Sequence, residues 1–209
     1  MSRFNLIRPT ASYLKEKLNL TTEEEEVAVF GLQLIFYPII GNLSVLIVGW
    51  LLGCFWTTFA VLITIVALRL LSGGAHSNTP LICYLMGIVF VPLLGKLAQL
   101  TVPFLSSLSL SVAIIIGLMV SLVIFLRLAP VDCPAKPITD TAQRRKLRFY
   151  SIILILVFTA GQCLLLCNDK TLDLVWAVSL GLWWQAFSLT ASGHRFAAFI
   201  DNLFMKGGE

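Results

Sequence analysis

Long apolar stretches separated by short polar segments dominate the pattern of the chain. A membrane-spanning helix needs about 20 mostly apolar residues, because hydrocarbon offers backbone amides and carbonyls no partner outside the helix. The first apolar stretch, 27–71, is long enough to cross twice, and Gly49, Trp50 and Gly53 predict a tight turn between the two passes. The third predicted span, at 81–94, is the shortest, and Lys96 ends it. A re-entrant segment is therefore also compatible with the pattern there. The apolar stretches are 27–71, 81–94, 108–128, 149–166 and 172–189.

Composition agrees with six spans. Of 209 residues, 58% are hydrophobic and 12% are charged, whereas soluble domains carry about a quarter charged residues. The mean hydropathy is +0.91. A water-soluble domain of this size is therefore excluded, and we predict an all-α integral membrane protein. We expect one polytopic membrane domain at 27–190, preceded by a cytoplasmic or interfacial segment at 1–26 and followed by a cytoplasmic tail at 191–209. The run 192–195 is expected to end the last helix.

The segment before the first span is polar, which argues against a cleaved signal peptide. Apolar and basic residues recur at helical spacing within 11–20, as in an amphipathic helix lying on the membrane, although a solvated lead-in fits equally well. Thr21, followed three residues later by Glu24, predicts a helix start. The acidic run 23–26 would stabilise the positive end of that helix. Recognition of a basic partner is the alternative role for these carboxylates.

Lys and Arg residues concentrate on one side of the six-span arrangement. Short loops rich in these residues stay in the cytoplasm, and the opposite side has only Lys96 and Lys170. We therefore predict that both termini and the loop 69–80 are cytoplasmic. Because no basic face is interleaved with aromatic residues, we expect no nucleic-acid partner. The basic residues of the cytoplasmic side are Arg3, Arg8, Lys15, Lys17, Arg69, Lys136, Arg144, Arg145, Lys146, Arg148, Arg195 and Lys206.

One short stretch combines Arg69, Gly73, Gly74, His76 and Cys83 at the predicted cytoplasmic end of two spans. Polar and ionisable side chains are energetically costly at such a position, so their presence there indicates a functional role. A cysteine peptidase needs a thiolate beside an imidazole, because the imidazolium stabilises the thiolate at neutral pH. His76 and Cys83 are the only such pair close together in the sequence. One His and one Cys do not make a metal site, so we expect no metal and no other cofactor.

The spacing of this pair requires a bend in the chain. On a continuous helix, seven residues would hold His76 and Cys83 about 10 Å apart, too far for proton transfer. Gly73 and Gly74 permit positive φ angles, and Pro80 suits the first turn of a new helix. Cys83 would then lie in the opening turn of the third span, where the positive helix end favours a thiolate. From spacing alone, packing roles for both side chains remain the alternative.

The motif Arg-x-x-x-Gly-Gly-x-His-x-x-x-x-x-x-Cys, at 69–83, resembles that of the AgrB family. The members of this family are membrane cysteine endopeptidases of Gram-positive quorum-sensing systems, and they process the autoinducing-peptide precursor AgrD. A second similarity lies at 129–132, where Ala-Pro-Val-Asp looks like the family's Ala-Pro-x-Asp loop and precedes a basic cluster. The resemblance covers nearly the whole chain.

The resemblance implies Cys83 as the nucleophile and His76 as the general base. It implies Arg69, Gly73 and Gly74 as supporting residues of the active-site loop. The expected setting is the cell membrane of a Gram-positive bacterium, with a multi-pass chain and the active site at the cytoplasmic face.

The resemblance also implies an AgrD-like propeptide as substrate, with an acidic tail. Asp132 would orient His76 or contact the substrate, although an Asp after Pro is usually a turn residue. Lys136 and the cluster 144–148 would contact acidic groups, although positive-inside topology alone explains these cations.

The implied reaction removes the C-terminal tail of the propeptide, passes through a thioester acyl-enzyme and closes a thiolactone or lactone ring. The alternative is a non-enzymatic transporter or export accessory for a peptide, in which His76 and Cys83 merely pack. Intramembrane charge pairs would favour transport, and the predicted spans carry none. A small structural membrane protein is a third class. Homodimerisation is an expectation by analogy with other small membrane enzymes.

Overall fold

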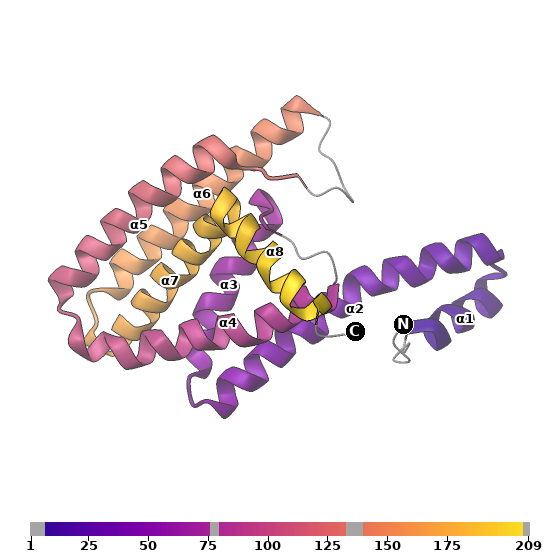
Figure 1. Cartoon of the computed structure of the whole chain (residues 1–209), viewed down its shortest axis with the longest axis horizontal. Helices are drawn as coiled ribbons and strands as arrows, with labels where there is room; N and C mark the ends of the chain where they lie inside the picture. The colour runs from indigo at the N-terminus through magenta and orange to yellow at the C-terminus, as the bar shows by residue number, and fades with distance from the viewer. Residues whose placement is uncertain (1–6, 76–79, 133–139, 207–209) are drawn as a thin grey trace. The chain divides into compact units, whose positions relative to one another are not determined.

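The computed structural model describes residues 7–75, 80–132 and 140–206, with the side chains of Leu34, Pro80, Leu81, Met205 and Lys206 excepted. All regular structure in this part of the chain is helical (Figure 1). The elements are α1 Ile7–Leu18, α2 Thr22–Leu51, α3 Phe55–Ser72, α4 Pro80–Thr101, η1 Val102–Phe104, α5 Ser107–Leu128, α6 Thr141–Leu165, η2 Asp169–Thr171, α7 Leu172–Leu189 and α8 Ala191–Lys206. Two candidate site residues predicted from the sequence, His76 and Lys136, lie outside the described residues.

Within the described residues, six helices are long and apolar enough to cross a membrane, which confirms the predicted all-α, multi-span fold. The prediction that Lys96 ends the third span is wrong, because α4 continues through it to Thr101. The Lys96 ammonium donates to the Leu52 carbonyl at 3.1 Å and to Gln99 Oε1 at 2.9 Å. These contacts satisfy its charge at the end of the helix bundle. The third span is therefore long enough to cross completely, and no re-entrant segment is needed.

The chain divides into two compact units, 1–44 and 45–209. In the first unit, the predicted start of α2 is confirmed: the Thr21 amide donates to Glu24 Oε2 at 2.8 Å, and the Glu24 amide donates to Thr21 Oγ1 at 3.3 Å. This reciprocal pair satisfies two amides that have no partner inside the helix. Helix α1 covers most of the predicted amphipathic stretch, and its position on a membrane surface stays a prediction.

In the second unit, α3 is central and packs against α4, α6 and α7. Small residues permit close approach of its neighbours. A Cβ atom placed at Gly49 of α2 or at Gly95 of α4 would lie 2.6 Å from Thr58 Oγ1, and one placed at Gly181 of α7 would lie 3.1 Å from Thr64 Cβ. Lipid tails are as apolar as the helices, so association rests on such tight packing.

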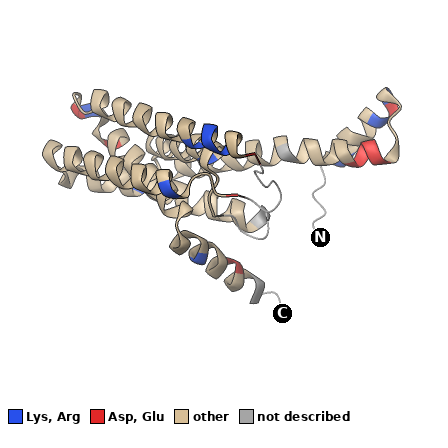
Figure 2. Cartoon of the chain, turned by 90° about the horizontal axis from the view of Figure 1, so that it is seen from above, with Lys and Arg blue, Asp and Glu red and all other residues tan. Residues whose placement is uncertain are grey.

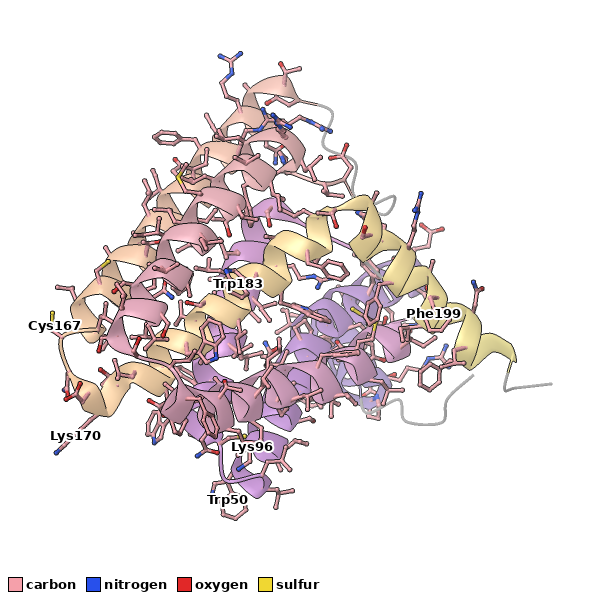
Figure 3. The ribbon with its side chains drawn as sticks, turned by 60° about the vertical axis from the view of Figure 1, so that its left-hand side comes forward. Trp50, Lys96, Cys167, Lys170, Trp183 and Phe199 are labelled. Atoms are coloured by element: carbon pink, nitrogen blue, oxygen red, sulfur yellow. The ribbon has the colours of Figure 1, made fainter. Side chains whose placement is uncertain are left out.

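Successive helices of the second unit run in alternating directions and create two ends (Figure 1). One end holds the turn between α2 and α3, where Trp50 and Lys96 lie, together with Lys170 (Figure 3). At this end, the indole N–H of Trp176 in α7 donates to Thr101 Oγ1 in α4 at 2.8 Å and so links the two helices. The opposite end, which we call the loop end, contains the described residues 69–75, 80–83, 127–132, 140–148 and 188–195. Its described basic residues, blue in Figure 2, are Arg69, Arg127, Arg144, Arg145, Lys146, Arg148 and Arg195.

Two helices at the loop end differ from the sequence prediction. Helix α6 begins at Thr141, earlier than expected, because the Asp140 carboxylate accepts from two amides of its first turn, at 2.9 and 3.2 Å. The prediction that 192–195 ends the last helix is wrong. The Thr190 hydroxyl accepts from the Gly193 amide at 3.2 Å and so caps a further helix, α8. N-cap hydroxyls of this kind satisfy the first free amides of a helix.

Candidate active site

The end of α3 builds the first part of the site. Gly73 ends the helix with φ 67° and ψ −145°, and Gly74 follows with φ 144°. Residues with a Cβ atom rarely adopt these conformations, so glycine is needed at both positions. Helix α4 then begins at Pro80. The end of α3 at the glycines and the start of α4 at Pro80 agree with the predicted interruption of the helix. The bend between His76 and Cys83 stays a prediction, because His76 lies outside the described residues.

One side chain and one carbonyl of α7 hold this turn in place. The buried Gln185 amide donates to the Gly73 carbonyl at 2.8 Å and to Ser72 Oγ at 3.1 Å. The Ala75 amide donates to the Ser188 carbonyl at 2.9 Å. A Cβ atom at Gly74 would lie 2.7 Å from Ser188 Oγ, so the backbone of the turn lies directly against α7. The segment that leads into His76 is therefore fixed by the last span.

Two further contacts fix the same turn from other directions. The Arg69 guanidinium donates to the Ala75 carbonyl across the turn. The Val131 amide, in the segment between α5 and α6, donates to the Ser72 carbonyl at 2.9 Å. A Cβ atom at Gly73 would collide with the Val131 carbonyl oxygen. Arg69 and Gly73, both predicted as supporting residues, thus belong to one hydrogen-bonded turn.

Cys83 is a free, half-buried thiol in the first turns of α4. It lines a cavity of about 90 Å³ together with Arg69 and Ala75. The residue directly before His76 and the predicted nucleophile therefore share one cavity. The other described residues of the lining are mostly apolar and come from α3, α4, α7 and α8: Ile65, Met86, Gly87, Phe90, Val91, Trp184, Phe187, Ser188, Gly193, Phe196 and Ala197.

Packed aromatic rings form one wall of this cavity. Phe90 of α4 stacks on Trp184 of α7 with a centroid distance of 5.0 Å and an interplanar angle of 26°. Phe196 of α8 packs edge-on against Phe90 at 5.5 Å and against Phe187 at 6.1 Å. A Cβ atom at Gly193 would collide with the backbone of Phe187, so this glycine permits α8 to fold tightly against the end of α7.

The electrostatic setting of the cavity favours a negative charge. The guanidinium group of Arg69 carries a fixed positive charge at its edge. The first turn of α4 adds the partial positive charge of a helix N-terminus. An oxyanion formed in this cavity, when a nucleophile attacks a carbonyl, is stabilised by both. Among the described residues, no group of three or more His, Cys, Asp or Glu side chains could hold a metal ion.

Asp132 is paired with Arg144 of α6, and the two side chains are 38% and 40% exposed. Asp132 directly follows Val131, whose amide donates to the Ser72 carbonyl. A contact of Asp132 with His76 or with the substrate stays a prediction, since both His76 and Lys136 fall outside the described residues.

Sequence reasoning missed the contribution of α7 and α8. Gln185 offered a signal, because an amide inside an otherwise apolar span is costly unless it is bonded. Trp184 and Phe187 offered none, since aromatic residues near the end of a span are typical of membrane-interface anchors.

Comparison with known proteins matches the chain to one family. The sequence profile of the family described as Accessory gene regulator B matches residues 7–189. The chain is 28% identical over 211 residues to an AgrB-like protein of Clostridium perfringens (strain SM101 / Type A), which covers 97% of this chain and 98% of the relative. An AgrB-like protein of Halalkalibacterium halodurans is 27% identical over 188 residues, with 90% and 87% covered. No solved structure matches the chain significantly.

Proposed function

The chain belongs to the accessory gene regulator B family, and from this we propose that it is a membrane cysteine endopeptidase of a peptide-signalling system. Its substrate is an AgrD-like propeptide, the partner that family membership implies. The enzyme removes the C-terminal tail of the propeptide and closes the remaining peptide into a ring. The relatives come from Clostridium and Halalkalibacterium, which suggests a Gram-positive source.

The observation that carries the proposal is the cavity shared by Cys83, Arg69 and Ala75. Of the other described cysteines, Cys54 is buried against Thr58 in the bundle, and Cys163 and Cys167 are exposed. Cys83 alone among them combines a cavity, a helix N-terminus and a neighbouring cation. The rigid turn that ends at Ala75 supports a role for the next residue, His76, as the base.

In the first half-reaction, His76 takes the proton of the Cys83 thiol, and the thiolate sulfur attacks a backbone carbonyl of the propeptide. The C–N bond breaks, the proton passes from His76 to the leaving amine, and the tail departs. The rest of the peptide is then bound to Cys83 as a thioester. Arg69 and the α4 N-terminus stabilise the oxyanion of the tetrahedral intermediate.

In the second half-reaction, an internal thiol or hydroxyl of the same peptide attacks the thioester carbonyl. His76 accepts its proton and returns it to the Cys83 sulfur as that bond breaks, which leaves a thiolactone or lactone and the free enzyme. Thioester exchange is nearly neutral in energy, so release of the tail favours the overall reaction. Cyclisation exceeds hydrolysis only when water is excluded and the internal nucleophile is held close. The apolar walls around Cys83 support such exclusion.

The distribution of basic residues supports a cytoplasmic loop end. Seven described Lys and Arg residues of the second unit belong to it, and the opposite end has Lys96 and Lys170. By the positive-inside rule, the active site and both termini then face the cytoplasm. Arg144, held by Asp132, and Lys136 are proposed contacts for acidic groups of the propeptide. Homodimerisation stays a prediction by analogy.

The proposal is tested by co-expressing the protein with the small open reading frame beside its gene and following the peptide by mass spectrometry. Cys83→Ala and His76→Ala should each abolish removal of the tail while membrane insertion is retained. Cys167→Ala and His194→Ala are matched controls, because both side chains are exposed, and they should leave processing unchanged. Normal processing by Cys83→Ala, or export of an intact peptide regardless of either substitution, would refute the peptidase and favour a transporter.

A further inference from the structure

We propose that the cavity beside Cys83 is a specificity pocket for the substrate side chain that precedes the scissile bond, and that its size selects a branched or linear aliphatic side chain. This inference rests on the proposed peptidase function. It adds the property that decides which peptide bond is cut, and it assigns this property to residues of α4, α7 and α8.

Position is the first argument. In the acyl-enzyme, the residue that precedes the scissile bond is covalently attached to the Cys83 sulfur. Its side chain must therefore occupy space that adjoins this sulfur. Cys83 lines the cavity, and so do Met86, Gly87 and Phe90 of the same helix. These residues are three or four positions apart from Cys83 or from one another, so they share one helix face, turned toward the cavity.

Chemistry is the second argument. Apolar groups of Met86, Phe90, Trp184 and Phe196 make up much of the lining. The hydroxyl of Ser188, a polar residue of the lining, already donates to the Gln185 carbonyl at 2.8 Å. A polar side chain among these apolar groups would lose its hydration without gaining equivalent hydrogen bonds. A carboxylate would in addition compete with the oxyanion of the proposed reaction for Arg69, the cation of the described lining. Apolar side chains gain from the same burial.

Size is the third argument. The cavity measures about 90 Å³, whereas benzene is known to enter engineered apolar protein cavities of about 150 Å³. The space beside Cys83 thus favours a smaller aliphatic side chain over an aromatic ring, and the stacked rings of Phe90 and Trp184 resist enlargement of that space. The side chains of Val, Leu, Ile and Met fit, and that of Ala fits but leaves most of the space empty.

Gly87 offers a direct way to change the pocket. A Cβ atom at this position would meet no other atom within 4 Å, so a side chain can begin there without displacing a neighbour. Because Gly87 belongs to the lining, a leucine there would take up the space that the substrate needs. Gly161 of α6 is the matched control, since a Cβ atom there also meets nothing within 4 Å and the residue is outside the lining.

The experiment compares full-length protein in membranes acting on propeptides that carry Leu, Ala, Phe or Asp before the scissile bond, which mass spectrometry locates beforehand. Wild type should cleave the Leu peptide fastest, and the Phe and Asp peptides at least about tenfold more slowly, the scale set by small changes in an apolar pocket. Gly87→Leu should slow the Leu peptide by about tenfold and leave the Ala peptide within about twofold. Gly161→Leu should resemble wild type with every peptide.

A second variant keeps the inference testable if Gly87→Leu fails to insert. Met86→Ala enlarges the cavity and should raise cleavage of the Phe peptide relative to the Leu peptide. The inference is overturned if Gly87→Leu cleaves the Leu peptide at the wild-type rate, or slows the Leu and Ala peptides equally. It is also overturned if Met86→Ala leaves the preference unchanged. In all three cases, loss of cleavage in Cys83→Ala would still support the peptidase, so the two proposals fail separately.

Discussion

The turn after α3 makes Gly73 the position where a single methyl group should be most damaging. At φ 67° and ψ −145°, a residue with a Cβ atom costs about 1–3 kcal/mol. The added methyl would also collide with the Val131 carbonyl oxygen. If the segment between α5 and α6 moves away, the hydrogen bond from the Val131 amide to the Ser72 carbonyl is lost, at about 1 kcal/mol. We therefore expect Gly73→Ala to destabilise the turn by about 2–4 kcal/mol.

Gly53 provides the matched control. Its φ of 68° is nearly the same, and a Cβ atom there meets nothing within 4 Å. Gly53→Ala then carries the conformational cost alone, about 1–2 kcal/mol, at the end of the bundle far from Cys83. It should lower the unfolding temperature and leave the rate of peptide cleavage per folded molecule unchanged.

The assay is cleavage of the propeptide by equal amounts of membrane-inserted protein, with thermal unfolding in detergent as the measure of stability. Gly73→Ala should lower the cleavage rate by at least about thirtyfold, which corresponds to about 2 kcal/mol in the transition state. Wild-type cleavage by Gly73→Ala would refute the argument that this turn positions the base. An equal loss of cleavage in Gly53→Ala would show that general destabilisation is sufficient.

Three further substitutions test other parts of the structure. Gln185→Leu removes two hydrogen bonds to the turn. It should lower the free energy of unfolding by about 1–3 kcal/mol and also lower the rate of cleavage. Ala186→Leu, the control at the neighbouring position, should not lower the rate of cleavage when it is inserted normally. Asp132→Asn breaks the exposed pair with Arg144; we expect a rise in KM at nearly constant kcat and a stability change under about 1 kcal/mol. Gly95→Leu should separate α3 from α4 at Thr58 and prevent recovery of folded protein, measured by size-exclusion chromatography.

The spans and the glycine bend could be predicted because each depends on local pattern. The last span was predicted at its observed limits, Leu172–Leu189, since apolar length alone determines it. The partners of the turn could not be predicted, because Gln185 lies 112 residues after Gly73 in the sequence. Which helices become neighbours depends on the fit of their surfaces, and hydrophobic periodicity does not encode that fit. Helix α8 was missed because its start depends on one capping hydroxyl, that of Thr190.

The contacts of the turn with Gln185 and Ser188, and the wall formed by Phe196, have a consequence for biosynthesis. When Cys83 leaves the ribosome and reaches the membrane, about the last hundred residues of the chain are still untranslated, and folding generally follows the order of synthesis. A nascent chain at that stage has the thiol without its pocket and without the anchors of its turn. Under the proposed function, Cys83 would thus become competent only when the last membrane-spanning helix has been inserted, so each newly made molecule would complete its topology before it could process a peptide.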